Sequence, residues 1–423
     1  MADKGHNEIK AKRTTTLSQG IFNVSKSAVG AGALRLPYAV SKLGIAGGVG
    51  VLLFVSFITT TTLHFLARMA ANLDVGDYFT LGNMAFGVVG EVVAMISLVL
   101  FLIGGLIFYI DKAQEFTVNV ISEVIPSLSE YRSSLPLIVT VVTAVLIFPL
   151  AAQRDMSALA KGAMIGMVCM GYILVLTVAD YLYAVATGAT APDVVMIVPF
   201  SFGDFFRTFS GMLFAFVNHF TLLAVVPVMV DPSPKRRMSL TLSSSGVVLG
   251  FYLLVAVCGY LHFGATVPQL VLSACTAKSG PIKWAYQAGS LLVAVVLILS
   301  YPLLLDPARG TIEGALIRFA GGAPHSASRS LIITFVLVAL PTFIALTFKE
   351  RVLNILDVFV AFTGALLLFI FPGGFFLRFQ DKYHVSPIER VLAYISVAFG
   401  FVLMIFGTYY SVVDLVAPAA GIQ

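Results

Sequence analysis

The chain has 423 residues, of which 59% are hydrophobic and only 11% are charged, and its mean hydropathy is +0.97. A soluble domain carries about a quarter charged residues, so this composition excludes an ordinary soluble enzyme or binding domain. The formal net charge of +5 is explained by basic cytoplasmic loops rather than by an anionic partner such as nucleic acid. We therefore predict an all-α polytopic membrane protein.

Apolar runs long enough to cross about 30 Å of hydrocarbon predict eleven transmembrane helices. They form one transmembrane domain over residues 17–413, between a disordered N-terminus at 1–16 and a short tail at 414–423. The third run is the least regular, because "YIDKAQE" (residues 109–115) places charges partway along it. The predicted spans are 17–41, 45–71, 88–122, 134–152, 160–187, 207–231, 243–265, 283–306, 329–348, 353–377 and 391–413.

The distribution of positive charge predicts the orientation of these spans. If the N-terminus is cytoplasmic, the cytoplasmic side carries more than twice as many lysines and arginines as the outer side. The odd number of spans then makes the tail extracytoplasmic. The plasma membrane is the expected location, with a lysosomal or vacuolar membrane as the alternative.

The first span is interrupted at "SAVGAGALRLP" (residues 27–37), where Gly30 and Gly32 are followed by Arg35 and Pro37. Backbone polar groups in lipid need partners, so irregular backbone persists only where it lines a cavity. Carriers use such unwound segments to hold a substrate near the bilayer midplane. We therefore expect a binding site here, although a Gly-x-Gly pattern is also typical of close helix packing.

The sixth span shows a second interruption. "FSGMLFAFVNHFTLLAVVPVMVDP" (residues 209–232) combines Gly211, the cluster "FAF", Asn218 and Pro227. Discontinuous first and sixth helices fit a five-plus-five inverted repeat, with one extra helix to make eleven.

Four motifs in order resemble the amino acid/auxin permease family, which includes the sodium-coupled neutral amino acid transporters. The first is "FNVSKSAVGAGALRLPYA" (22–39) and the second is "FAFVNH" (214–219). The others are "GYLHFG" (259–264) and "YPLLLDPARGTIE" (301–313). The similarity runs from about residue 17 to residue 413.

The resemblance implies the bacterial leucine transporter fold and secondary transport of amino acids. It also implies that backbone of the two interrupted helices contacts the substrate's α-carboxylate and α-amino groups. The side chains of Phe214 and Phe216 either close over the ligand or belong to the core. The implied residues are Val29, Gly30, Ala31, Gly32, Ala33, Phe214, Ala215, Phe216 and Val217.

Lys26 departs from the family pattern, because sodium-coupled relatives have asparagine at this position. A charged lysine deep in a membrane costs roughly 2.5 to 3.5 kcal/mol. We expect its ammonium group to take the place of sodium, near a hydroxyl such as that of Ser300. This substitution predicts a transporter that is sodium-independent or proton-coupled. The alternative is that Lys26 points into the cytoplasmic vestibule or reaches the headgroups.

Other charges inside the spans have two interpretations each. Arg35 either pairs with an acid as an outer gate or anchors the structure. Asp180 and Asp357 lie in the outer halves of their spans, where a paired structural role is favoured over proton transfer. His219 is expected to be a core histidine.

Together these patterns predict a secondary active transporter of amino acids, with neutral L-amino acids favoured and alternating access as the mechanism. The alternatives are a sodium-coupled symporter, a cationic amino acid transporter, or an amino acid sensor with little flux. The sequence has no catalytic motif, so no enzyme, cofactor or metal site is predicted. The expected partners are the amino acid, H⁺ or Na⁺ as coupling ion, and lipid; oligomeric state stays open.

Overall fold

The structure is a computed structural model that describes residues 13–131, 134–153, 157–199, 201–277, 280–321, 326–383 and 385–417. The described residues are nearly all helical, with one isolated bridge between Thr15 and Met229. Most of the predicted N-terminal segment and tail lie outside the described residues. The main helices are α1 (Leu17–Ala28), α2 (Leu36–Leu73), α3 (Tyr78–Val124), α4 (Leu135–Ala152), α5 (Ser157–Thr187), α6 (Phe202–Leu213), α7 (His219–Val225), α8 (Pro234–Phe263), α9 (Gly280–Ala320), α10 (Ala327–Phe348), α11 (Val352–Phe359), α12 (Phe371–Arg378), α13 (Pro387–Val402) and α14 (Thr408–Val416).

Shorter helical turns join several of these helices. The 3₁₀ turn η1 (Ala31–Arg35) connects α1 to α2, and η3 (Phe214–Phe216) follows α6. Two successive π-helical segments, η8 (Val360–Gly364) and η9 (Leu366–Ile370), lie between α11 and α12. A third π-helical segment, η11 (Leu403–Gly407), separates α13 from α14.

Within the described ranges, nine helical stretches are long and apolar enough to cross a membrane. Several of these stretches contain a break in the backbone, and two of the breaks divide a stretch into two helices. Ala31–Leu73 turns at Gly44, where φ is +76°, and Ala327–Arg378 turns at Lys349, where φ is +30°. Both breaks fall between neighbouring spans that the sequence predicts. The structure therefore has the expected multi-pass helical bundle, and the count of eleven stays a prediction.

The break at Gly44 is held by an irregular segment around residues 195–198. The backbone amide of Ile45 donates to the carbonyl of Val195 (3.2 Å), and that of Ala46 donates to Met196 (2.9 Å). The amide of Val198 donates in return to the carbonyl of Leu43 (3.2 Å). These hydrogen bonds supply partners for polar groups that the interrupted helix leaves free.

Helix α3 carries the charges predicted to disturb the third span. Its 47 residues contain a break at Phe86 and Gly87, so the turns before the break form a separate helical segment. Farther along, the Lys112 ammonium lies 2.9 Å from a carboxylate oxygen of Asp111 and 2.6 Å from one of Glu115. Pairing of the buried Asp111 and Lys112 with each other, and of Lys112 with the partly exposed Glu115, lets the helix continue through the charged stretch.

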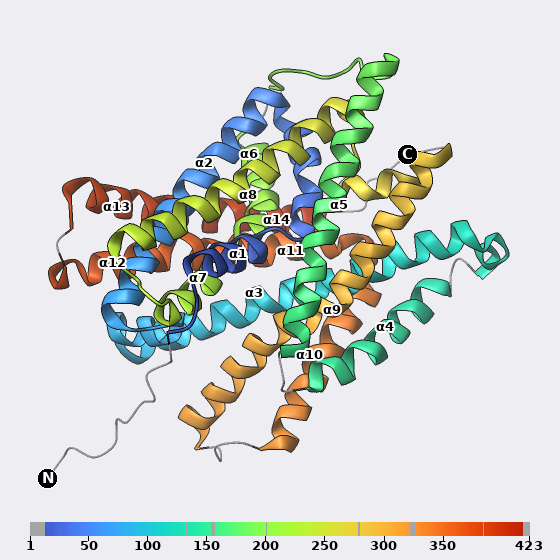
Figure 1. Ribbon diagram of the computed structural model, residues 1–423. Coiled ribbons are helices and arrows are strands. Elements are labelled where there is room, and N and C mark those ends of the chain that lie inside the picture. The colour runs from blue at the N-terminus through green and yellow to red at the C-terminus, as the bar shows by residue number, and fades with distance from the viewer. Residues whose placement is uncertain are drawn as a thin grey trace, which may run out of the picture.

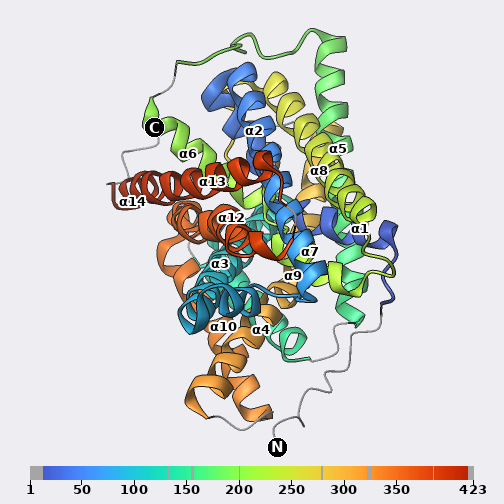
Figure 2. The same cartoon turned by 90° about the vertical axis from the view of Figure 1, so that its left-hand side faces the viewer.

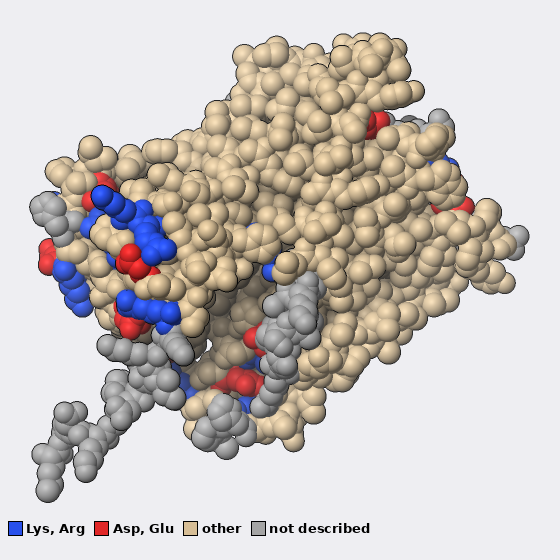
Figure 3. All heavy atoms as spheres, in the orientation of Figure 1, with Lys and Arg blue, Asp and Glu red and all other residues tan. Residues whose placement is uncertain are grey.

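The helices around the first interruption pack against one another. Helix α3 packs along α9, and α2 packs along α8. Figures 1 and 2 both show α1 and α7 side by side, with α8 next to α1. Figure 3 shows charged side chains gathered near α12 and α13, while the broad middle of this face carries almost none. Such an uncharged band is suited to contact with lipid.

Gly44→Ala tests whether the break in α2 requires glycine. A Cβ at this position would lie 2.7 Å from the Met196 carbonyl oxygen, and φ is positive. We expect the variant to lose about 2 kcal/mol or more of stability, because a positive φ with extended ψ is nearly restricted to glycine and alone costs about 1–3 kcal/mol for another residue. The measurement is thermal unfolding of the purified protein in detergent.

Gly50→Ala is the matched control on the same helix. A Cβ at Gly50 meets no atom within 4 Å. This variant should be unchanged or more stable by roughly 0.5–1 kcal/mol, as for glycine in an ordinary helix interior. Equal stability of the two variants would contradict the proposed need for glycine at position 44.

Candidate functional site

In the first interrupted helix, two extended residues separate two helical segments. Thr16 and Gln19 form a capping box that begins α1, and the helix ends at Ala28. Val29 and Gly30 are both extended, with φ of −71° and −146°. The chain then continues as η1 and α2. The break predicted from the glycines is therefore located at Val29 and Gly30.

The second interrupted helix breaks directly after its aromatic cluster. Helix α6 continues through the 3₁₀ turn η3, Val217 is extended with ψ of 94°, and α7 begins at His219. The described structure thus has two helices, α1 and α6, that end inside the bundle and resume after extended residues. This pair is the arrangement that the sequence predicts for the first and sixth spans.

The two glycines of the first break have different roles. A Cβ on Gly32 would lie 3.0 Å from Ala215 Cα and 3.2 Å from its backbone nitrogen, so Gly32 allows the two breaks to touch. A Cβ on Gly30 would have its nearest neighbour 3.9 Å away. Gly32 therefore serves close packing, whereas Gly30 lies beside open space.

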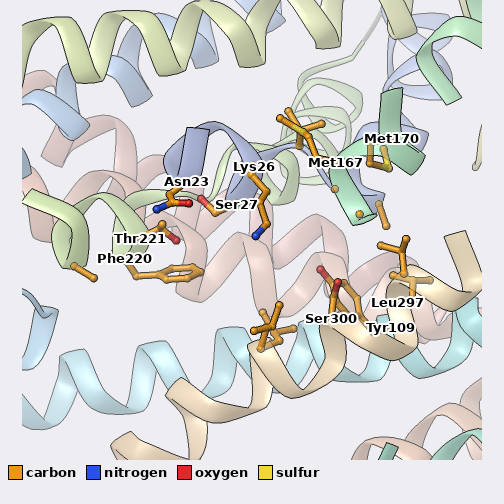
Figure 4. A pocket seen from close by; sticks show the side chains of 18 of the residues that line it. Asn23, Lys26, Ser27, Tyr109, Met167, Met170, Phe220, Thr221, Leu297 and Ser300 are labelled. Carbon is orange, nitrogen blue, oxygen red and sulfur yellow. The ribbon is translucent and has the colours of Figure 1, made fainter. Parts of the chain in front are cut away.

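That open space is a cavity of about 450 Å³. Its wall includes Val29, Gly30 and Ala31 from the first break, together with Lys26 and Ser300. Figure 4 shows Lys26 extending from α1 into the cavity, on the side facing Ser300 and Tyr109, and Figure 3 shows that the molecule is hollowed beside α7. The structure thus brings five of the predicted site residues together.

Several lining residues were not predicted as site residues. Asn23 and Ser27 lie on α1 within one turn of Lys26, so helical spacing was an available signal for them. The others come from α3, α5 and α7, whose apolar sequences do not distinguish a cavity wall from a lipid-facing surface. These residues are Tyr109, Met167, Met170, Phe220 and Thr221.

The charge of the cavity comes from one side chain. Lys26 is half-buried, and no aspartate or glutamate lines the cavity among the residues that the structure describes. Within that same part of the chain, Lys26 forms no ion pair. The site therefore presents one ammonium group, several hydroxyl and amide groups, and a largely apolar wall.

The remaining predicted residues lie behind the cavity wall. Gly32, Ala33 and the segment 214–217 do not line it. The ring of Phe214 packs against Phe108 with 5.5 Å between centroids, and Phe216 packs against Tyr252 at 5.1 Å. Both rings are thus part of aromatic packing next to the site.

Arg35 pairs with Asp357 on the far side of the breaks. Two guanidinium nitrogens contact the two carboxylate oxygens at 2.6 and 2.9 Å, and only 10% and 18% of the two side chains are exposed. The pair lines a second cavity of about 510 Å³, which also contains Lys42 and Arg207. A bidentate pair in this position joins η1 to α11.

The other intramembrane candidates also have partners. Asp180 accepts a hydrogen bond from the Tyr286 hydroxyl (2.8 Å) and lies 3.1 Å from His262 Nε2. His219 is fully buried, with Nε2 2.9 Å from the Thr62 hydroxyl. These contacts agree with the paired and core interpretations of the two residues.

A bundle of apolar helices with two interrupted helices beside a central cavity is the architecture of a membrane transporter. The fold is similar to that of MhsT in complex with L-phenylalanine, with a TM-score of 0.62, 14% identity, and 95% and 99% of the two chains covered. It is also similar to an Eremococcus coleocola manganese transporter, with a TM-score of 0.57, 13% identity, and 99% and 93% covered. The chain therefore has the leucine transporter fold.

The family model described as "Transmembrane amino acid transporter protein" matches residues 13–413, so the chain belongs to this family of transporters and is not an enzyme. A Bos taurus protein named "Putative sodium-coupled neutral amino acid transporter 11" is 25% identical over 402 residues, which cover 93% of this chain and 83% of that protein. The family assignment from the sequence motifs is confirmed.

Gly30→Ala and Gly32→Ala should distinguish the role of Gly30 beside the cavity from the role of Gly32 in close backbone packing. The methyl group at position 30 fits the fold but occupies space beside the cavity, so we expect native stability and weaker ligand binding. The methyl group at position 32 meets the backbone of Ala215, so we expect lower stability, by about 1–3 kcal/mol as for overpacking. Thermal unfolding with and without amino acids measures both effects, and identical behaviour of the two variants would refute the distinction.

A double-mutant cycle of Arg35→Ala and Asp357→Ala should give a large coupling free energy. Each single variant leaves a poorly exposed charge unpaired, which costs about 3–5 kcal/mol for a buried pair, and the double variant should recover much of that loss. The exposed pair Arg236–Asp231, 3.5 Å apart, is the control and should couple by about 0.2–1 kcal/mol. Similar coupling in both cycles would show that Arg35–Asp357 behaves as a surface pair.

Proposed function

We propose that this protein is a secondary active transporter of neutral L-amino acids that works by alternating access. The observation that carries the proposal is the cavity bounded by the unwound backbone of Val29, Gly30 and Ala31 inside a bundle of apolar helices. Free amide and carbonyl groups at such breaks are suited to the α-carboxylate and α-amino groups of an amino acid. Rocking of one part of the bundle against the rest would expose this site alternately to the two sides.

The preference for neutral substrates is supported by the charge of the cavity. A cationic side chain would meet Lys26, and within the described residues no lining carboxylate offsets that repulsion. The apolar wall formed by Met167, Met170 and Leu297 suits an uncharged side chain. The name of the bovine relative, which refers to neutral amino acids, points in the same direction. The segment 214–217 lies behind the cavity wall and packs against Gly32 in this conformation, so its proposed contacts to the substrate backbone require the two breaks to move relative to each other.

Coupling is proposed to be sodium-independent, with Lys26 in the place of a sodium ion. Lys26 and Ser300 line the same cavity, and Figure 4 shows the lysine extending toward the serine. A lysine in such a position supplies a fixed positive charge and, by losing its proton, offers a route to proton coupling. The sodium-coupled name of the relative makes sodium dependence the competing outcome.

The pair Arg35–Asp357 is proposed as an outer gate of this transporter. The pair lines the second cavity, and in this proposal the two charges part when a route opens from that cavity to the break in the first helix. We further propose a cytoplasmic N-terminus, a plasma-membrane location, and a single transport domain at 17–413. Dividing two of the nine apolar stretches at Gly44 and Lys349 supports eleven helices in a five-plus-five inverted repeat with one extra helix.

Uptake by liposomes containing the purified protein tests the proposal. Labelled neutral amino acids are offered with sodium or an inert cation outside, and with or without an inward proton gradient. We expect uptake that ignores sodium, and we expect Lys26→Asn to become sodium-dependent or to lose at least about tenfold in rate, because the fixed charge is gone. Lys382→Asn, at an exposed lysine, is the control and should retain native uptake.

Two results would contradict parts of this proposal. Sodium-dependent native uptake with normal transport by Lys26→Asn would refute the coupling role and leave amino acid transport intact. Absence of uptake under every gradient, with amino acid binding retained, would refute transport and favour a sensor.

A further inference from the structure

Tyr252 connects the two interrupted helices through one hydroxyl group. The residue lies on α8 and is fully buried. Its hydroxyl donates to the carbonyl oxygen of Ala28 at 2.7 Å and also hydrogen-bonds the carbonyl oxygen of Ala215. Ala28 is the last residue of α1, and Ala215 lies in the turn that continues α6. A single hydrogen is thus shared between the ends of both broken helices.

Carbonyl groups at these positions have a strong need for a donor. The last carbonyls of a helix have no partner within the helix and carry the negative end of its dipole. Two such ends facing each other in a water-poor interior would repel, and each unsatisfied carbonyl would be costly. The Tyr252 hydroxyl provides the donor that allows the ends of α1 and α6 to approach.

The position of this hydroxyl is fixed by packing. The Tyr252 ring meets Phe216 edge to face, with 5.1 Å between centroids and an interplanar angle of 80°. Four residues beyond Ala28, Gly32 makes its close backbone contact with Ala215. The first and second breaks are therefore held together at two points, a shared hydrogen bond and a van der Waals contact, and both points include Ala215.

We propose that Tyr252 is a positioning residue of the transport site, which fixes the separation and register of the two unwound segments. The proposal rests on the proposed function, because it assigns these segments to substrate binding. Tyr252 itself does not line the cavity, so it acts through the backbone carbonyls that it holds. Loss of its hydroxyl should therefore weaken substrate binding without removing any substrate contact.

Tyr252→Phe tests this role because it keeps the ring and removes only the shared hydrogen. Uptake by liposomes should show KM for the amino acid raised by about fivefold or more, the equivalent of one lost hydrogen bond. Hydrogen exchange followed by mass spectrometry should show faster exchange in segments 28–33 and 214–218. The second measurement needs no substrate, so it remains informative whatever the protein transports.

Tyr78→Phe is the matched control. Tyr78 is equally buried, donates to the carbonyl oxygen of Leu367 at 2.7 Å, and packs against Phe371. Its loss should lower thermal stability to a similar extent but leave KM and exchange at both breaks unchanged. If Tyr252→Phe does not fold, 3-fluorotyrosine at position 252 keeps the hydroxyl, strengthens it as a donor, and should slow exchange at both segments.

The outcomes separate this inference from the proposed function. Unchanged KM or unchanged exchange in a folded Tyr252→Phe protein would overturn the positioning role, even if the native protein transports amino acids. If the native protein moves no amino acid, the proposed function fails. Faster exchange confined to the two breaks would then still support Tyr252 as the residue that positions them.

Discussion

The need of every buried backbone polar group for a partner is the constraint on which this structure depends. Where α2 breaks at Gly44, the segment around 195–198 supplies the hydrogen bonds. Where α1 and α6 stop, Tyr252 supplies the donor for their terminal carbonyls. The backbone of Val29 to Ala31 adjoins the open space of the central cavity. Because unpaired amides are costly in a membrane interior, backbone beside such a cavity is where a ligand could supply the missing partners.

Charges inside the bundle follow the same logic. Arg35 has Asp357, Lys112 has two neighbouring carboxylates, and Asp180 has Tyr286 and His262. The Arg35 and Asp180 contacts join different helical segments, whereas the Lys112 pairs lie within α3. Lys26 differs, because it faces a cavity and has no ion-pair partner in the part of the chain that the structure describes. Its charge is therefore available to interact with whatever enters.

Local sequence signals predicted the interrupted helices well, because glycine, proline and an arginine in an apolar run have direct backbone consequences. The same signals placed Lys26 and Gly30 at the site. They could not identify Asp357 as the partner of Arg35, since 322 residues separate the two. The role of Tyr252 could not be predicted from the sequence either, because its partners are backbone carbonyls and every residue has one. The sequence could not show which of the two glycines serves packing, because the contact of Gly32 depends on the approach of Ala215 in the folded chain.

The π-helical segments that follow α11 determine how the Arg35–Asp357 pair responds to a change of chain length. A π-helical turn contains an additional residue relative to an α-helical turn, and here two such segments, η8 and η9, occur in succession. Because each π-helical turn absorbs its additional residue, removing one residue from such a turn can restore α-helical winding there while the helices on either side keep their relative orientation. Removing one residue from ordinary α-helical winding would instead rotate the preceding helix by about 100° relative to the following one. The segment 360–370 is thus a place where the chain can lose a residue while Asp357 still faces Arg35.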